Sequence, residues 1–197
     1  MGLITDNYFV SDRHTTFYLA SGPENGPLIY LLHGWPELSL SWRHQIECLG
    51  GLGFRVIAPD MRGYGRSSVY LTHDAYAQIE VITDMLELHD HISKRPAVWI
   101  GHDWGSAVAW NIGKHYSENV HGIVSLCVPL GLESGVDTLI DYIDRDLYPE
   151  DSFPKGQWDY QYFYQENFRE ATKQMDADPE SVVRLLFRKG NPKHVGK

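Results

Sequence analysis

Two glycines placed symmetrically around an aspartate constrain this sequence more than any other feature. The segment Gly101–Gly105, with the sequence GHDWG, follows the short apolar run Ala97–Ile100, which is typical of a strand buried on both faces. The residues after it continue to Tyr116 without proline and predict a helix that begins near Trp104. Glycine is needed in a tight turn where backbone atoms approach closely. The segment therefore predicts a strand, a sharp turn that carries Asp103, and a helix.

An aspartate at such a turn has a distinct chemical meaning. The free N–H groups at the start of a helix keep a carboxylate ionised and direct one of its oxygens outward. A carboxylate needs no partner base to attack an electrophilic carbon and form a covalent ester. The same spacing also fits a plain glycine turn with a capping aspartate, and the five residues alone do not separate the two interpretations. The rest of the chain has to separate them.

Composition excludes several classes of protein. The sequence is 43% hydrophobic and 22% charged, as is ordinary for a globular protein. Its net charge of −9 argues against nucleic acids and anionic membranes as partners, because both select basic surfaces. No apolar run approaches the length of a membrane span, and the first residues lack the pattern of a signal peptide. Composition leaves a homo-oligomer open.

Cysteine usage points to a reducing compartment. Cys48 and Cys127 are the only cysteines, too few for a disulfide framework. Each lies in or beside an apolar run, where a buried free thiol is the usual arrangement. We therefore expect two buried thiols and a cytoplasmic protein.

Strands alternate with helices along the first two thirds of the chain. The predicted elements are a hairpin over 7–20, strands over 28–32, 55–58, 97–100 and 123–128, and helices over 39–49, 74–92 and 104–116, the first capped by Ser39 or Ser41. This order predicts an α/β fold with a mostly parallel sheet flanked by helices. His33, Asp60 and Asp103 each follow a predicted strand, so we expect them at one edge of the sheet. Asp60 and Arg62 are interpreted as a turn-stabilising ion pair or a cap.

The alternation ends at Pro129, which divides the sequence into two predicted domains. Residues 1–129 form the predicted α/β core. Residues 130–197 carry many acids and an aromatic segment over 158–166, and Val182–Phe187 suggest a helix that ends near Gly190. We expect this second part to be a helical cap over the active edge of the sheet.

With these residues located, the chain resembles the α/β-hydrolase fold and, within it, the epoxide hydrolases, over nearly its full length. Three segments of the core carry the resemblance: His33–Pro36 (H-G-x-P), Asp60–Ser67 (D-x-R-G-x-G-x-S) and the elbow Gly101–Gly105. In the cap, Asp159–Glu166 is similar to the segment that contains one of the family's two lid tyrosines. Asp103 with Trp104 beside it is the most specific match. Haloalkane dehalogenases share that pair, but serine hydrolases do not.

The resemblance implies that Asp103 is a nucleophile and that Tyr160 donates a proton to the oxygen of an opening epoxide. A phenol with an unperturbed pKa near ~10 suits an alkoxide leaving group. If the register is misjudged, Tyr162 or Tyr164 takes this place. The expected reaction converts a small apolar epoxide and water into a vicinal diol through an ester on Asp103, without a cofactor or a metal.

The remaining site residues would support this chemistry. Backbone N–H groups of Trp35 and Trp104 are expected to form the oxyanion hole during ester hydrolysis, and their side chains to line the pocket with Tyr164. Loop-structuring roles are expected for four residues: His33, Gly34, Pro36 and His102. The resemblance also implies a cis peptide bond at Pro36.

The sequence departs from the family pattern after the cap. Family members continue with two further strands that supply a catalytic acid, a histidine base and the second lid tyrosine, whereas this chain stops at Lys197. None of the ten histidines matches the base, since His194 lies in a proline-containing tail, and Glu133 is no convincing substitute for the acid. We therefore expect an uncovered sheet edge and an ester on Asp103 that accumulates.

Two alternatives stay open. One is a haloalkane dehalogenase. Trp35 and Tyr160 weigh against it, because that family prefers a side-chain halide donor in the loop after His33 and Gly34, where this chain has Trp35, and needs no lid tyrosine. The other is a truncated α/β-hydrolase-like chain that binds small ligands or a partner without chemistry.

Overall fold

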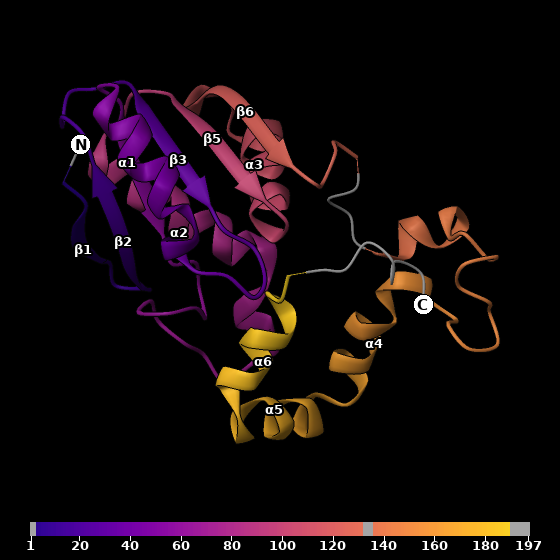
Figure 1. Cartoon of the computed structure of the whole chain (residues 1–197). Helices are drawn as coiled ribbons and strands as arrows, with labels where there is room; N and C mark the ends of the chain where they lie inside the picture. The colour runs from indigo at the N-terminus through magenta and orange to yellow at the C-terminus, as the bar shows by residue number, and fades with distance from the viewer. Residues whose placement is uncertain (1–2, 132–135, 190–197) are drawn as a thin grey trace. The chain divides into compact units, whose positions relative to one another are not determined.

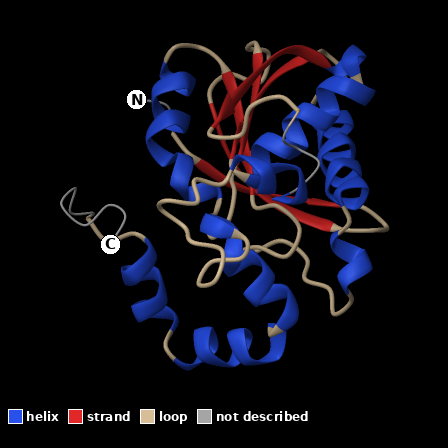
Figure 2. Cartoon of the chain, turned by 90° about the vertical axis from the view of Figure 1, so that its right-hand side faces the viewer, coloured by secondary structure: helices blue, strands red, loops and turns tan. Residues whose placement is uncertain are grey.

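The computed structural model describes residues 3–131 and 136–189. The chain divides into two compact units, Met1–Glu133 and Ser134–Lys197. The first unit contains a mixed sheet flanked by helices, and the described residues of the second form helices and loops (Figures 1 and 2). The predicted α/β architecture with a mostly parallel sheet is confirmed.

The sheet has six strands in the order β1-β2-β4-β3-β5-β6. The strands are β1 (Thr5–Val10), β2 (Thr15–Ser21), β3 (Leu28–Leu32), β4 (Arg55–Pro59), β5 (Ala97–His102) and β6 (Val120–Leu126). The hairpin of β1 and β2 is antiparallel and joins β4, whereas β4, β3, β5 and β6 pair in parallel. The carboxyl ends of β3, β4 and β5 therefore share one edge, where His33, Asp60 and Asp103 follow them.

The helices of the first unit lie on both faces of this sheet. They are the 3-10 helices η1 (Ser39–Trp42), η2 (His73–Tyr76) and η3 (Ser117–Asn119) and the α-helices α1 (Arg43–Gly51), α2 (Gln78–Ile92) and α3 (Trp104–His115). Side chains alternate along β3, so Tyr30 packs in the layer beneath α2 and α3, whereas Leu31 packs beneath α1. Two apolar layers thus hold the central strands from both sides.

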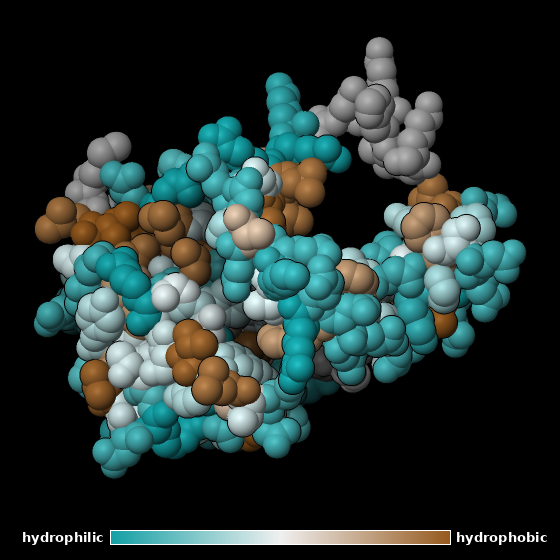
Figure 3. Space-filling model, turned by 90° about the horizontal axis from the view of Figure 1, so that it is seen from below, coloured by the Kyte–Doolittle hydropathy of each residue, from teal (hydrophilic) through white to brown (hydrophobic). Residues whose placement is uncertain are grey.

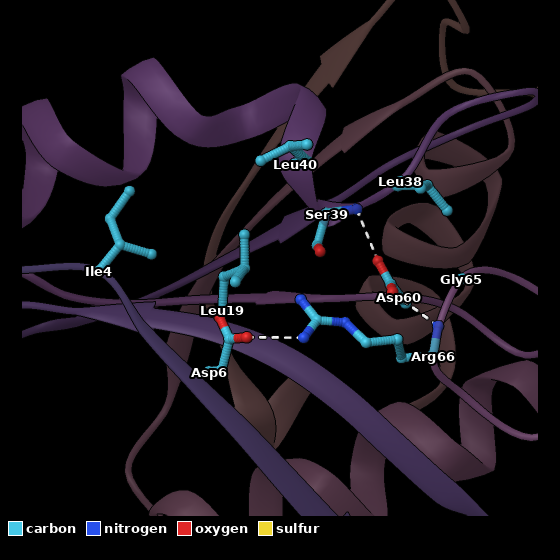
Figure 4. A pocket seen from close by; sticks show the side chains of 9 residues that line it. All are labelled: Ile4, Asp6, Leu19, Leu38, Ser39, Leu40, Asp60, Gly65 and Arg66. Atoms are coloured by element: carbon cyan, nitrogen blue, oxygen red, sulfur yellow. Dashed lines mark hydrogen bonds and ion pairs between the residues drawn. The ribbon is translucent and has the colours of Figure 1, made fainter.

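The predicted serine cap of the helix over 39–49 is wrong. Neither N-cap residue, Leu38 for η1 or Trp42 for α1, makes a side-chain capping hydrogen bond. Instead, the Asp60 carboxylate accepts the Ser39 N–H at 2.9 Å through Oδ1 and the Arg66 N–H at 3.0 Å through Oδ2. Figure 4 shows Asp60 between these two groups, at the wall of a pocket of about 270 Å³. A carboxylate that is distant in sequence therefore does the work expected of a neighbouring hydroxyl.

Of the two roles expected for Asp60 and Arg62, the ion pair between them is wrong, whereas Asp60 does act as a cap, because its carboxylate accepts the N–H of the first residue of η1. Arg62 instead forms a two-point ion pair with Asp84 of α2, with Nε at 2.6 Å from Oδ2 and Nη2 at 2.7 Å from Oδ1. Both side chains are buried. A buried charge needs such a partner, and the pair fastens the loop after β4 to α2.

The two cysteines are exposed, which corrects the expectation of buried thiols. In α1 the buried side is marked by Ile46 and Gly50, and Cys48 lies on the outer side. Cys127 comes directly after β6 with a left-handed φ of 66°, where the strand has already ended.

The second unit is built from short helices. They are η4 (Val136–Tyr142), η5 (Gly156–Trp158), α4 (Asp159–Glu166), α5 (Phe168–Ala177) and α6 (Pro179–Leu186). The Asp178 side chain caps α6 by accepting the Ser181 N–H at 3.1 Å, and Pro179 opens the helix. This helix contains most of the predicted segment Val182–Phe187. The division of the chain into a core over 1–129 and a lid over 130–197 stays a prediction.

Glu133, Gly190 and His194, which entered the sequence analysis, lie outside the described residues. Over 3–131 and 136–189, no helix is long and apolar enough to cross a membrane.

Three buried histidines make the stability of the first unit depend on pH. Burial lowers the pKa of His14, His33 and His89 below the ordinary value. His89 packs in the aromatic core against Trp99 and Tyr30, and neither of its ring nitrogens has a hydrogen-bond partner among the described residues. Protonation of such a ring places an unpaired charge in an apolar layer.

We predict that the free energy of unfolding falls as the pH is lowered below about 6.5, because the unfolded chain then binds protons that the folded chain excludes. Urea unfolding at about pH 7.5 and about pH 5.5 measures this difference. His89→Phe should lose less stability between the two pH values than the unsubstituted chain. Equal losses in both proteins would show that His89 does not contribute.

Candidate active site

Asp103 lies at a sharp turn between β5 and α3. Its φ of 51° is left-handed, which a non-glycine residue adopts at an energetic cost, and α3 begins at the next residue. The turn is closed by the Ser106 N–H, which donates to the Asp103 carbonyl at 2.9 Å, and the Asp103 N–H donates to Leu126 O at 3.3 Å. The predicted strand, sharp turn and helix are confirmed, and the carboxylate lies at the start of a helix, where an anion is stabilised.

The flanking glycines allow the turn to approach the sheet. A Cβ on Gly101 would lie 2.3 Å from Gly105 O, and a Cβ on Gly105 would lie 2.2 Å from Leu32 O at the end of β3. Both distances are far shorter than van der Waals contact. The elbow is therefore held directly against the strand that carries the neighbouring loop.

That neighbouring loop contacts the Asp103 carboxylate through its backbone. The Trp35 N–H donates to Asp103 Oδ1 at 2.9 Å, and the Trp35–Pro36 peptide bond is cis. A Cβ on Gly34 would lie only 2.4 Å from Asp103 Cβ, so glycine is required for this approach. Trp104, whose N–H is the second expected donor, is the first residue of α3 and directly follows Asp103.

His33 holds the same loop in place. Its Nε2 accepts the Met61 N–H at 3.0 Å, which leaves Nδ1 to carry the proton and donate to Gly34 O at 2.9 Å. The ring is fully buried, and burial lowers its pKa. Both nitrogens are therefore occupied by a neutral ring that joins the loops after β3 and β4.

Glu37 is a residue of the site that the sequence analysis missed. Its Oε2 lies 3.2 Å from Nδ1 of His102, so the residue after the H-G-x-P loop contacts the residue before Asp103. Both side chains are partly exposed. Its position directly after Pro36 was the only sequence signal. His102 thus links the turn after β5 to the loop after β3, whereas His33 links the loops after β3 and β4.

Tyr64 is a second residue that the sequence did not single out. Its ring packs edge-on against His33 with centroids 4.9 Å apart. Burial, together with the negative charge of Asp103, raises the pKa of Tyr64 to about 12. The phenol therefore stays protonated near the carboxylate. Its place within the D-x-R-G-x-G-x-S turn was the signal available.

The other expected site residues are divided between the two units. Trp104 is 45% exposed and Trp35 is partly exposed, so neither indole is sequestered in the core. Tyr160 and Tyr164 lie one turn apart on α4 in the second unit, with ring centroids 5.8 Å apart. Gln161 Nε2 donates to the Tyr160 hydroxyl at 3.1 Å. The structure thus assembles the Asp103 loops in one unit and the tyrosines in the other.

Within residues 3–131 and 136–189, no group of three or more histidine, cysteine, aspartate or glutamate side chains is arranged to hold an ion.

Comparison with known proteins identifies the family. The sequence profile described as "alpha/beta hydrolase fold" matches residues 27–181. The chain therefore belongs to the α/β hydrolase fold family.

Its relatives include named epoxide hydrolases. The chain is 34% identical to Epoxide hydrolase A of Mycobacterium tuberculosis over 190 residues, which cover 95% of this chain and 55% of that protein. It is 45% identical to Epoxide hydrolase B of the same organism over 106 residues, or 54% of this chain and 30% of the relative. The chain thus spans about half, or less, of the length of these curated relatives.

Solved structures of epoxide hydrolases are also similar to this chain. The crystal structure of Epoxide Hydrolase A from Mycobacterium thermoresistibile has a TM-score of 0.62 at 38% identity, and the match covers 64% of this chain and 40% of that one. The crystal structure of an epoxide hydrolase from Vigna radiata has a TM-score of 0.64 at 31% identity, and the match covers 75% of this chain and 45% of that one.

The close approach of Gly34 to Asp103 can be tested through stability. We predict that Gly34→Ala lowers the free energy of unfolding by about 1 to 3 kcal/mol, because its methyl group must displace Asp103 or the loop. Gly51→Ala is the control, since a Cβ there meets nothing within 4 Å. That substitution should leave stability unchanged or raise it by up to about 1 kcal/mol. Urea unfolding measures the free energy of unfolding of both variants. An unchanged value in Gly34→Ala would contradict the close approach of Gly34 to Asp103.

Proposed function

We propose that this protein acts on epoxides through a covalent ester on Asp103. The hydrogen bond from the Trp35 N–H to Asp103 Oδ1 at 2.9 Å carries the proposal. It fixes one carboxylate oxygen against a backbone donor and leaves Oδ2 as the attacking atom. The named epoxide hydrolases among the relatives support the same reaction.

In the first step, Asp103 Oδ2 attacks a ring carbon of the epoxide, and the bond from that carbon to the ring oxygen breaks. The ring oxygen takes both electrons of that bond and needs a proton. Tyr160 is the proposed donor. The hydrogen bond that its hydroxyl accepts from Gln161 supports this role, because it stabilises the phenolate that forms.

In the second step, water attacks the carboxyl carbon of the ester, and negative charge develops on Oδ1. The Trp35 N–H already lies at this atom, and we propose the Trp104 N–H as the second donor. Removing one such donor typically costs about 10²- to 10³-fold in rate. The buried His33 cannot accept the proton of the water, because both of its nitrogens are occupied. His102, beside Glu37, is the histidine next to the nucleophile.

The substrates that this reaction needs are an apolar epoxide and water. The proposed location is the cytoplasm, because two free thiols favour a reducing compartment. No observation in the described residues favours a haloalkane dehalogenase over an epoxide hydrolase. A side-chain halide donor would be expected at Trp35, whose backbone instead serves the nucleophile.

The nucleophile can be tested by trapping. We predict that incubation of the protein with styrene oxide adds the mass of one epoxide at Asp103, located by peptide mass spectrometry. Asp103→Asn should give no adduct there, because a carboxamide is not a nucleophile. Asp90→Asn, a change of the same type on the exposed side of α2, should leave the adduct intact. A folded protein without any adduct at Asp103 would contradict the proposal.

The fate of the adduct tests the second step. We expect the ester to persist after the epoxide is removed, because both ring nitrogens of the buried His33 are occupied by hydrogen bonds. The measurement is a time course of the intact mass together with the amount of diol released. Rapid release of diol would show that a base is present, and His102→Gln would then identify whether His102 is that base.

The proton donor is tested by two matched tyrosine variants. Tyr160→Phe should slow adduct formation by about 10²- to 10⁴-fold, because the ring oxygen then leaves without a proton. Tyr162→Phe is the control, since the Tyr162 hydroxyl contacts Asp137. It should react at the unsubstituted rate. If Tyr162→Phe slowed adduct formation more than Tyr160→Phe, the proton donor would be Tyr162 and the proposed role of Tyr160 would be wrong.

A further inference from the structure

A pocket of about 270 Å³ lies within the first unit, where the hairpin of β1 and β2, the start of η1 and the loop after β4 meet (Figure 4). Its floor is buried, since Leu19, Ser39 and Asp60 are each no more than 4% exposed. Its rim is open, since Leu40 is 57% exposed and the Arg66 side chain is 50% exposed. A small molecule therefore has access to a floor that the sheet holds in place.

The buried floor distinguishes this pocket from an ordinary exposed apolar residue. Hydrophobic side chains appear at several places on the mostly hydrophilic surface in Figure 3, so the exposure of Leu40 alone has no special meaning. At this pocket, however, Leu40 is joined by the buried Leu19 and by polar groups of η1 and of the loop after β4. Apolar walls with a few polar groups are typical of a small-molecule site, and the volume suits only a small ligand.

The Ser39 hydroxyl at the floor has no hydrogen-bond partner among the described residues. The backbone of Ser39 is held by Asp60, whose Oδ1 accepts the Ser39 N–H at 2.9 Å, so the hydroxyl is not used in that contact. Figure 4 shows the hydroxyl pointing into the pocket, although the residue as a whole is only 2% exposed. A polar group that is buried without a partner costs free energy, so a ligand oxygen that bonds to it stabilises the complex.

The charged groups around the pocket disfavour an anionic ligand. The lining contains two carboxylates, Asp6 and Asp60, and one guanidinium, Arg66. Arg66 Nη1 lies 2.6 Å from Asp6 Oδ2, so the positive charge is already neutralised. The Asp60 carboxylate accepts the backbone N–H groups of Ser39 and Arg66, which carry no net charge. One negative charge therefore remains at the pocket and repels an anion.

The polar groups left for a ligand are hydrogen-bond donors, which disfavours a cation. Figure 4 shows the second terminal nitrogen of Arg66 pointing toward the pocket. The Phe17 ring fixes the plane of this guanidinium, whose Cζ lies 3.5 Å from the ring centroid. The Ser39 hydroxyl can donate as well. An ammonium ligand offers these donors no acceptor, whereas an uncharged hydroxyl or carbonyl oxygen does.

We propose that this pocket binds a small uncharged molecule in which an apolar body carries one hydroxyl or carbonyl oxygen. The oxygen bonds with the Ser39 hydroxyl and the Arg66 guanidinium, and the apolar body lies against Leu19 and Leu40. All four residues belong to the first unit, and Asp103 does not line the pocket. The site is therefore independent of the proposed reaction, and each of the two proposals is tested without the other.

Three probes of one shape test the ligand class. Cyclohexanol, cyclohexanecarboxylate and cyclohexylammonium share an apolar ring and differ only in the polar group. Each is titrated into the isotope-labelled full chain, and the backbone amide NMR signals of Ser39 and Arg66 report binding. We expect cyclohexanol to shift both signals and to bind at least about fivefold more tightly than either charged probe, because a charged group loses water there without gaining a partner.

The other outcomes of this titration would overturn the proposal. Tighter binding of a charged probe would overturn the ligand class. Shifts confined to the residues around Asp103 would place the probe at the candidate active site. No shift with any probe would show that water alone fills the pocket.

Two serines of η1 provide matched variants. Ser39→Ala removes the hydroxyl at the floor and keeps the N–H that bonds to Asp60. Ser41 is exposed and does not line the pocket. Ser39→Ala should weaken cyclohexanol binding by about fivefold, through one lost hydrogen bond, and Ser41→Ala should leave it unchanged. Equal effects of the two variants, or no effect of Ser39→Ala, would overturn the role of this hydroxyl.

Two exposed leucines test the apolar wall. Leu40 lines the pocket, whereas Leu52, 70% exposed at the end of α1, does not. Leu40→Ser should weaken cyclohexanol binding by about threefold through lost apolar contact, and Leu52→Ser should not change it. Both leucines are exposed, so we expect both variants to fold, which urea unfolding verifies. Unchanged cyclohexanol binding in Leu40→Ser would overturn the pocket as the place of the apolar body.

Discussion

The hydrogen bond from the Trp35 N–H to Asp103 Oδ1 is the interaction on which the site depends. It joins the loop after β3 to the turn after β5, and it forms only because the two backbones are very close. Gly34 and Gly105 permit that approach, since a Cβ on either would overlap its neighbour. The left-handed φ of Asp103 then directs the carboxylate toward the loop. The geometry of the candidate site is thus a consequence of backbone packing at one edge of a mostly parallel sheet.

The surroundings of this hydrogen bond fix it from two sides. On the buried side, neutral His33 bonds both Gly34 and Met61, so the loops after β3 and β4 move together. The loop after β4 is fastened in turn by the ion pair of Arg62 with Asp84. On the accessible side, Glu37 contacts His102. Each contact joins segments that are distant in sequence, which makes the rim of the sheet one connected structure.

The sequence predicted the local elements better than the contacts between them. β3 was predicted residue for residue, because five buried apolar residues are bounded by a turn cluster and a histidine. β6 was predicted too late in the chain, since His121 and Gly122 conceal its beginning and Cys127 already leaves the strand.

The partner of Arg62 and the role of Glu37 were not predictable, because periodicity and spacing report on one element at a time. A pair between two elements depends on which faces they bury, and that is decided by the whole fold. Gly105 of the elbow is the exception. Its position encodes a long-range approach, because the steric limit that it meets lies in β3 and not in its own turn.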